Sequence, residues 1–214
     1  MATSSPPTTG TTAGTRTLLL CATAGAVIWT VVSLAQAATR DGFDLTRHPL
    51  SVLATGDLGW LQITNFVVGG VLTVLGAAGL RRALPEARVI YRLVAVDGVA
   101  RIVAGLLVMD PAPGFPPGTP EQVALTMSPS AVGHLLAGTV SFVALTVVCV
   151  LFGRRFSRAG QQGPAIASRA AATAVVLGNA WGIAGAPAGP VAVAVGVITG
   201  MLWLGAVTAA LARR

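Results

Sequence analysis

Residues Pro129–Phe152 read PSAVGHLLAGTVSFVALTVVCVLF, an apolar run that contains no charged residue. A helix needs about 20 mostly apolar residues to cross the hydrocarbon core of a bilayer. The run meets that length, so it predicts a membrane-spanning helix. The rest of the chain follows the same pattern.

Five further stretches share this length and apolar character. The six predicted spans are residues 17–39, 60–80, 90–109, 129–152, 170–187 and 190–211. Six spans in 214 residues leave no room for a separate soluble domain. We therefore predict an all-α integral membrane protein, with a single six-helix bundle over residues 16–214. A Ser/Thr/Pro/Gly-rich tail at residues 1–15 shows no apolar periodicity and is predicted to be a disordered cytoplasmic segment.

The basic residues set the orientation of the predicted bundle. All fourteen are arginines, and only Arg40 and Arg47 fall on the outer side, with Arg101 inside a span. The other side holds Arg16, Arg81, Arg82, Arg88, Arg92, Arg154, Arg155, Arg158, Arg169, Arg213 and Arg214. Cytoplasmic loops carry the excess of positive charge in membrane proteins. Both termini are therefore predicted to be cytoplasmic, in a plasma (inner) membrane.

The acidic residues show the opposite distribution. Five lie on the outer side, namely Asp41, Asp44, Asp57, Asp110 and Glu121. The net charge of +7 therefore averages a strongly basic inner face and a weakly acidic outer face. The arginines form no basic stripe with interleaved aromatic residues, which argues against a nucleic-acid partner. Membrane lipid with anionic headgroups is the partner that this distribution favours.

The first apolar segment has a second interpretation. Ala35-Gln36-Ala37 resembles a signal-peptidase site, so the segment before it could be a cleaved signal peptide. Its apolar run, however, exceeds the 7–15 residues that are usual in the core of a signal peptide. We therefore expect residues 17–39 to remain as the first span.

Glycines recur at a spacing of four in the last two spans. Gly178 and Gly182 lie in the fifth span, and Gly196 and Gly200 lie in the sixth. Small residues at this spacing let helix backbones approach closely inside a membrane. They predict close packing of these two helices, or a homo- or hetero-oligomer formed through them.

The outer connection between the first two spans is rich in ionisable groups. Pro49 is expected to begin a short helix and Gly56 to end it. Leu50 and Leu53 are then expected to lie on the membrane interface. Asp57 is expected to cap the second span.

The outer connection between the third and fourth spans is rich in proline and glycine. Thr119-Pro120-Glu121-Gln122 has the form of a capping box and predicts a second short helix. Ser128-Pro129 is typical of a helix start and predicts the beginning of the fourth span. The predicted architecture therefore has two short helices in its outer connections.

Several motifs in and near these connections are characteristic as a set. They are His48-Pro49-Leu50-Ser51, Gly56-Asp57, Asn65-Phe66, Asp110-Pro111, Gly114-Phe115-Pro116-Pro117-Gly118 and Gly133-His134. Together they resemble the bacterial multi-pass membrane family catalogued as domain of unknown function 998. The similarity runs from about Arg40 to Gly138. One departure is Leu107-Val108-Met109, where many relatives have an aromatic residue or proline. The resemblance implies a fold and a membrane location, and it implies no reaction.

Asp97 and Arg101 are two opposite charges in the middle of the third span. They are four residues apart and therefore share one helix face. Because burying either charge alone costs about 2.5–3.5 kcal/mol on insertion scales, we expect them to pair and to face the interior. Asn65 and Asn179 are expected as further partners. Two roles stay open: a neutral structural pair, or a proton or ion relay that also floors a ligand pocket.

A second candidate group consists of His48, Asp110 and His134. His134 lies near the beginning of the fourth span, where the helix dipole favours a neutral imidazole. Two histidines and a carboxylate, with Asp57 or a neighbouring aspartate in reserve, could hold a catalytic zinc ion. The spacing is not that of a metal motif such as HExxH. We therefore predict no cofactor, and we expect these residues to form hydrogen bonds that join the two outer loops. A bound divalent metal is the alternative.

A third group lies in the outer half of the predicted bundle. Trp60, at a span boundary, is expected to anchor the interface. Gln62, Asn65, Asn179 and Trp181 are polar or aromatic residues within spans. An apolar cavity with a few convergent polar groups is typical of a small-molecule or lipid-headgroup site.

The sequence thus predicts an outward-facing polar pocket that binds, or transports, a small molecule or lipid. Asp97 and Arg101 would form the floor. The rim would be formed by His48, Asp57, Asp110 and His134. One alternative is a membrane-embedded, metal-dependent hydrolase or transferase acting on lipid at the outer leaflet, although the sequence leans against an enzyme. Another is a non-catalytic partner subunit of a membrane complex.

Overall fold

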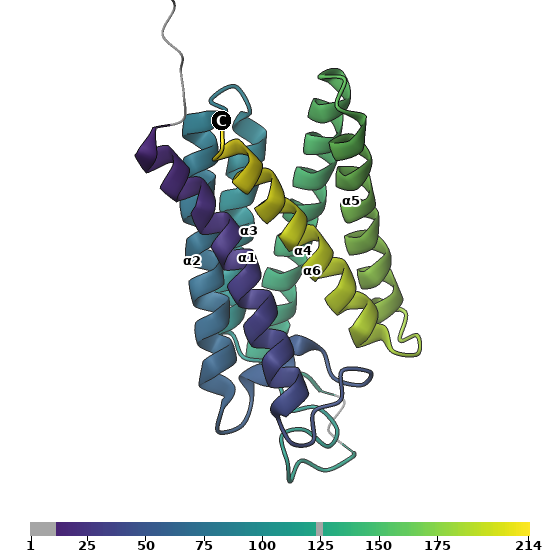
Figure 1. The fold of residues 1–214 in the computed structure, drawn as a ribbon. Helices are drawn as coiled ribbons and strands as arrows, with labels where there is room; N and C mark the ends of the chain where they lie inside the picture. Colours follow the sequence, from purple (N-terminus) through teal and green to yellow (C-terminus); the bar gives the residue numbers. More distant parts are fainter. Residues whose placement is uncertain (1–11, 123–125) are drawn as a thin grey trace, which may run out of the picture.

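The residues that the structure describes form a bundle of six α-helices. The computed structural model describes residues 12–122 and 126–214, and Figure 1 shows their arrangement. The helices are α1 (Ala13–Thr39), α2 (Gly59–Ala83), α3 (Arg88–Leu106), α4 (Pro129–Arg158), α5 (Gln162–Ile183) and α6 (Gly189–Leu211). A 3-10 helix, η1 (Leu50–Ala54), lies between α1 and α2. The prediction of an all-α fold is confirmed.

The six helices form a closed ring in chain order. Each helix packs against the next one, and α6 returns to pack against α1. The beginning of α1, the end of α6 and the α2–α3 turn lie at the same end of the bundle (Figure 1). We call this the terminal end. The opposite end, which holds η1 and the connection between α3 and α4, is called the loop end.

The composition of the helices is that of a membrane protein. Four helices, α1, α2, α4 and α6, are long and apolar enough to cross a bilayer. The outer surfaces of the bundle are apolar as well, since Val31, Leu136 and Leu177 are each more than half exposed. Side chains of this kind face lipid and not water when a helix spans a membrane. We conclude that the chain is a transmembrane protein.

The helix ends differ from the predicted spans at several positions. Helix α4 continues to Arg158, beyond the predicted end at Phe152, and α5 ends at Ile183, before the predicted end at Pro187. Helix α5 begins at Gln162, earlier than residue 170, and includes Arg169. The Arg169 guanidinium is accommodated because its Nη2 donates to Ser157 Oγ at 2.8 Å. Helix α3 ends at Leu106, three residues before the predicted end. Helix α1 begins at Ala13, inside the predicted tail, and residues 1–11 of that tail lie outside the described residues.

The glycines of α5 and α6 serve as close-packing sites within this chain. A Cβ atom added at Gly178 would lie 2.3 Å from the backbone oxygen of Ala192. One added at Gly196 would lie 2.4 Å from the backbone oxygen of Ala174. Neither position has room for a side chain, so the prediction of close α5–α6 packing is confirmed.

The outer connections correct two expectations and confirm one. Leu50 and Leu53 are buried, not placed on the membrane interface, because η1 packs against α1 and α2. Asp57 is exposed and does not cap α2, whose N-cap residue is Leu58 without a side-chain bond. Ser128 does cap α4, and its Oγ accepts the N–H of Ala131 at 3.1 Å.

The second short helix is not seen where its predicted capping box lies. Residues 119–122 are non-helical in the structure. The remainder of that prediction falls on residues 123–125, which lie outside the described residues.

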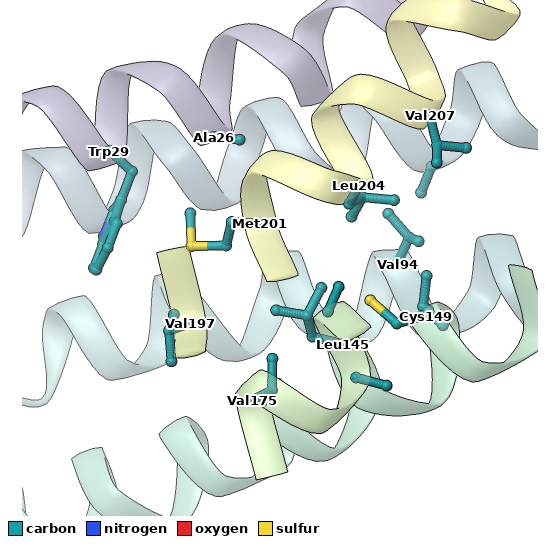
Figure 2. Packing of buried hydrophobic residues seen from close by; sticks show 14 of the residues in the cluster. Ala26, Trp29, Val94, Leu145, Cys149, Val175, Val197, Met201, Leu204 and Val207 are labelled. Carbon is teal, nitrogen blue, oxygen red and sulfur yellow. The ribbon is translucent and has the colours of Figure 1, made fainter. Parts of the chain in front are cut away.

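An apolar cluster fills the middle of the ring. Val94 of α3, Leu145 and Cys149 of α4, and Leu204 of α6 are at most 4% exposed. Figure 2 shows these side chains gathered between the three helices. We call these four residues the apolar plug. Along α3, Val94 lies between Arg101, nearer the loop end, and Ile90, nearer the terminal end. Along α6, Leu204 lies between Met201, nearer the loop end, and Val207, nearer the terminal end.

Candidate functional site: a cavity lined by all six helices

The buried ion pair organises the loop-end half of the interior. Asp97 is completely buried and Arg101 is 5% exposed. Arg101 Nε donates to Asp97 Oδ1 at 3.2 Å, and Arg101 Nη2 donates to Asp97 Oδ2. Ser141 of α4 donates its hydroxyl to Asp97 Oδ1 at 2.5 Å. The predicted pairing is confirmed, but the third partner is Ser141 and neither Asn65 nor Asn179.

A cavity of about 480 Å³ lies beside this pair. Residues from all six helices line it, and most of them are apolar. Pro49, Leu50 and Ser51 contribute from the first outer connection, and Met109 contributes from the second. The cavity is of the size that encloses a small organic ligand, about 300–1,000 Å³.

Two hydrogen-bond donors on the cavity lining have no acceptor. Arg101 and Trp29 both line the cavity. Among the residues that the structure describes, none accepts a hydrogen bond from the buried Nη1 of Arg101 or the buried Nε1 of Trp29. An unsatisfied buried donor costs about 1–3 kcal/mol, so such atoms are uncommon in folded proteins. Because both residues belong to the lining, the cavity is the candidate place for an acceptor.

His134 also lines the cavity, but its imidazole is tied to the end of α3. Its Nδ1 lies 2.7 Å from the Ala104 oxygen and 3.0 Å from the Leu107 oxygen, so Nδ1 carries the proton. The ring packs edge-on against Phe66 of α2. His134 thereby holds α4 against the last turn of α3, whose carbonyls would otherwise lack partners.

His48 holds the two outer connections together. The imidazole is 1% exposed, accepts the backbone N–H of Asp44 at Nδ1, and donates from Nε2 to the Pro113 oxygen at 2.9 Å. Phe43 and Phe115 pack against the ring. Both nitrogens are therefore used within the protein. The geometry agrees with the interpretation that His48 forms hydrogen bonds joining the outer loops, and not with a role as a metal ligand.

Arg40 reinforces the same contact between the connections. Its guanidinium donates to the Leu53 oxygen at 2.5 Å and to the Thr55 oxygen at 2.8 Å, and it lies over the Phe115 ring. Burial lowers the pKa of the Arg40 guanidinium, and the charge of Asp57 opposes this shift. The outer connections thus form a fixed roof over the bundle.

The proposed metal ligands do not come together. Asp110 Oδ2 accepts the backbone N–H of Ser128 at 2.8 Å, which fixes the carboxylate at the beginning of α4. Hydrogen bonds from Ser128, through its side chain and its backbone, lower the pKa of the Asp110 carboxyl. His48 and His134 use their nitrogens elsewhere. In residues 12–122 and 126–214, no three His, Cys, Asp or Glu side chains form a group that could hold a metal ion.

Asn65 belongs to a polar cluster between α1 and α2. Its Nδ2 donates to Ser33 Oγ and to the Trp29 oxygen, both at 3.1 Å. Gln62 Oε1 accepts from Gln36 Nε2 at 2.8 Å. All of these amide and hydroxyl side chains are buried. The cluster joins α1 to α2 and, because it includes the Trp29 backbone, it positions one wall of the cavity.

The two remaining candidates on α5 have different surroundings. Asn179 lines the cavity, and its Nδ2 donates to Val175 of its own helix at 2.8 Å. Trp181 is 52% exposed and donates from Nε1 to the Pro187 oxygen at 3.0 Å, at the α5–α6 turn. Trp60 is 59% exposed at the beginning of α2, the position expected of an interfacial anchor.

The family of the chain follows from a comparison with family models. Residues 23–210 match the model described as protein of unknown function (DUF998). The chain belongs to the DUF998 family. The match extends beyond the motifs between Arg40 and Gly138 and includes all of α2 to α5 and nearly all of α6. No curated protein and no solved structure matches the chain.

The structure of this DUF998 protein separates the predicted site residues into two groups. Arg101, Asn179 and His134 line the cavity, with Asp97 bonded behind Arg101. The others are absent from the lining, namely Asn65, Trp181, Asp57, His48 and Asp110.

Three residues of the cavity lining in this DUF998 chain were not predicted from the sequence. They are Trp29, Gly138 and Ser141. One signal was available: His134, Gly138 and Ser141 are four and three residues apart, so they fall on one face of α4. Trp29 carried no such signal, since a tryptophan in a span is usually a packing residue.

Proposed function

We propose that this DUF998 protein binds an amphipathic molecule in the central cavity. The apolar body of the ligand would lie among the aliphatic and aromatic side chains. Its headgroup would accept hydrogen bonds from Arg101 Nη1 and Trp29 Nε1. A carboxylate, a phosphate or a carbonyl group has the required acceptor chemistry.

The unpaired donors on the cavity lining are the observation that carries this proposal. The carboxylate of Asp97 occupies only Nε and Nη2 of the Arg101 guanidinium, because these two atoms hold it in a bidentate pair. Nη1 is then left to face another acceptor. A ligand that supplies this acceptor would gain a charge-assisted hydrogen bond in a low-dielectric interior, where such bonds are strong.

We also propose that the ligand is bound in a six-span plasma-membrane protein with both termini in the cytoplasm. Helices α3 and α5 are the two spans that hydropathy alone does not identify. The closed ring supports them as spans, because each packs along both of its neighbours. The arginines at the terminal end support the orientation. A green fluorescent protein fused to the C-terminus is expected to fluoresce, whereas a fused periplasmic phosphatase is expected to be inactive.

The packing of the interior agrees better with a protein that binds its ligand than with one that transports the ligand through the bundle. Val94 and Leu204 of the apolar plug lie nearer the terminal end of α3 and α6 than the lining residues Arg101 and Met201. Transport would require Val94, Leu145 and Leu204 to separate. Among the residues that the structure describes, no arrangement of side chains favours the enzyme or the partner subunit over a binding protein.

The proposal can be tested with cis-parinaric acid, a fluorescent fatty acid, and the purified full-length protein. Gly138 lines the cavity, and a Cβ atom added there meets nothing within 4 Å. Gly138→Phe is therefore expected to fill the cavity and to abolish saturable binding. Trp29→Phe keeps an aromatic ring but removes one donor, and is expected to weaken binding about three- to tenfold.

Gly163→Phe is the matched control, because Gly163 also has open space around it but is not part of the lining. This variant is expected to bind cis-parinaric acid as the native protein does. Equal binding by the Gly138 and Gly163 variants would show that the probe does not enter the cavity, and the proposal would then be wrong. The methyl ester of the probe is expected to bind more weakly than the acid.

A further inference from the structure

A second cavity lies at the terminal end, on the other side of the apolar plug. Its volume is about 650 Å³. It is lined by the α2–α3 turn and the beginning of α3, by the end of α4, and by the end of α6. Five arginines contribute to the lining, namely Arg88, Arg154, Arg155, Arg158 and Arg214. We call this cavity the arginine pocket.

Only one of these arginines is neutralised within the pocket. Arg155 Nη2 lies 2.7 Å from Glu86 Oε1, and Glu86 is the one acidic residue of the lining. The guanidinium groups of Arg88, Arg154 and Arg158 make no hydrogen bond or ion pair within residues 12–122 and 126–214. Arg155 and Arg158 lie in the last turn of α4, where positive charge is also favourable to the helix dipole. Arg88 and Arg154 have no such role.

The base of the arginine pocket is apolar and buried. Ile90 of α3, Phe152 of α4 and Val207 of α6 are each at most 6% exposed. Phe152 and Phe156 stack with their ring centroids 5.9 Å apart, and both line the pocket. Val89 also lines the pocket and is 60% exposed, so the pocket presents apolar surface beside the arginines. The pocket is therefore amphipathic.

The beginning of α3 adds a further feature that favours an anion. The N-cap residue is Ala87, which makes no side-chain cap, and the first turn contains no acidic residue. Unpaired N–H groups and the positive end of the helix dipole favour a negative group at such a terminus. Ala87, Arg88 and Val89 all line the arginine pocket.

We propose that the arginine pocket binds the headgroup of an anionic phospholipid. The phosphate would lie between Arg88, Arg154 and the first turn of α3, and the adjoining acyl chains would cover the exposed Val89 and the half-buried Phe156. Charge complementarity selects an anion, and this apolar surface selects one that is attached to a hydrocarbon chain. A soluble phosphate would satisfy the arginines and leave Val89 and Phe156 uncovered.

The site is distinct from the central cavity. No residue lines both cavities. Along α3, Val94 lies between Ile90 of the arginine pocket and Arg101 of the central cavity. Along α6, Leu204 lies between Val207 and Met201. Variants of the arginine pocket are therefore expected to leave binding of cis-parinaric acid unchanged. The proposal for the central cavity and the proposal for the arginine pocket can therefore be tested independently.

The test measures lipids that remain bound to the full-length protein. The protein is reconstituted into nanodiscs of phosphatidylcholine with a graded fraction of phosphatidylglycerol, and retained lipids are counted by native mass spectrometry. Because each arginine near an anionic surface contributes about 1 kcal/mol, R88Q/R154Q is expected to weaken retention of phosphatidylglycerol at least tenfold. Retention of phosphatidylcholine is expected to stay the same.

R81Q/R82Q is the matched control. It removes the same charge from the same end of the bundle, in the last turn of α2, and neither residue lines the pocket. It is expected to retain phosphatidylglycerol like the native protein. If both double variants lose phosphatidylglycerol retention equally, the loss reflects general surface charge and the proposal is wrong. Displacement of phosphatidylglycerol by millimolar inorganic phosphate would overturn it as well, because the pocket would then select a soluble anion.

All four arginines are exposed, so the variants are expected to fold. Thermal unfolding of each purified variant provides the check. An unchanged melting temperature with unchanged lipid retention in R88Q/R154Q would exclude the site.

Discussion

The two cavities of this protein hold positive charge in different ways. In the central cavity, Arg101 is bonded to Asp97, which in turn accepts a hydrogen bond from Ser141. In the arginine pocket, Arg88 and Arg154 are exposed and have no acidic partner in the described chain. The contrast follows from depth. A charge in the middle of a bilayer must be neutralised on site, whereas a charge at the headgroup level is satisfied by water and lipid.

The difference predicts where a mutation acts. Changes to the central pair are expected to reduce the stability of the fold. Changes at the ends of the bundle are expected to leave the fold intact and to alter what it binds. Three predictions test this division, in order of decreasing effect.

The largest effect is expected from Asp97→Asn. The change leaves the Arg101 guanidinium buried without its counter-ion, and breaking a buried pair in this way costs about 3–5 kcal/mol. Unfolding of the purified protein, followed by temperature or by added sodium dodecyl sulfate, measures the loss. The double variant D97L/R101L removes both charges together and is expected to be close to the native protein in stability, because an apolar pair of similar size needs no neutralisation.

The comparison between these variants also addresses the relay hypothesis. If Asp97→Asn unfolds no more easily than the native protein, the pair is not a structural element. A role in proton or ion movement would then be the better explanation.

Ser141→Ala is expected to have an intermediate effect. Ser141 donates to a carboxylate in a dry interior, and a hydrogen bond to a charged group contributes about 1.5–3 kcal/mol. Thr146→Val is the control, since its hydroxyl bonds only to Phe142 of its own helix. The decisive measurement repeats Ser141→Ala in the D97L/R101L background. There the substitution is expected to be nearly silent, and an undiminished loss would mean that Ser141 acts independently of the pair.

Much of the fold could be predicted from the sequence, because membrane insertion depends on a few strong rules. Apolar length identified the helices, and the spacing of Asp97 and Arg101 placed them on one interior face. The glycines at positions 178 and 196 predicted the α5–α6 contact. Helix ends were less accurate, because an arginine such as Arg169 can stay inside a helix when its guanidinium reaches a polar partner near the interface.

The candidate site was harder to predict, because sequence gives the depth of a residue and not its direction. His48 and Asp110 lie at the loop end, as expected, but each bonds to a neighbouring backbone. Prolines and glycines in the outer connections determine those directions, and no periodic pattern describes such segments. Leu50 and Leu53 were misplaced for the same reason, since nothing in the local sequence shows that η1 packs inward.

The smallest effect is expected at Asp110, a partly buried charge at the loop end. Hydrogen bonds from Ser128 lower the pKa of its carboxyl below the ordinary value of 3.8. A group with a lowered folded-state pKa stabilises the fold at pH values above 3.8, and this contribution is lost as the pH falls through the folded-state pKa. Asp110→Asn is therefore expected to melt slightly below the native protein at pH 7, and the difference is expected to disappear once the pH has fallen below the folded-state pKa of the carboxyl. Melting curves of both proteins across this range test the sign. A difference in melting temperature that persists in acid would mean that the negative charge of Asp110 does not fix the beginning of α4. The geometry of the hydrogen bond to Ser128, and not the charge, would then explain the stability.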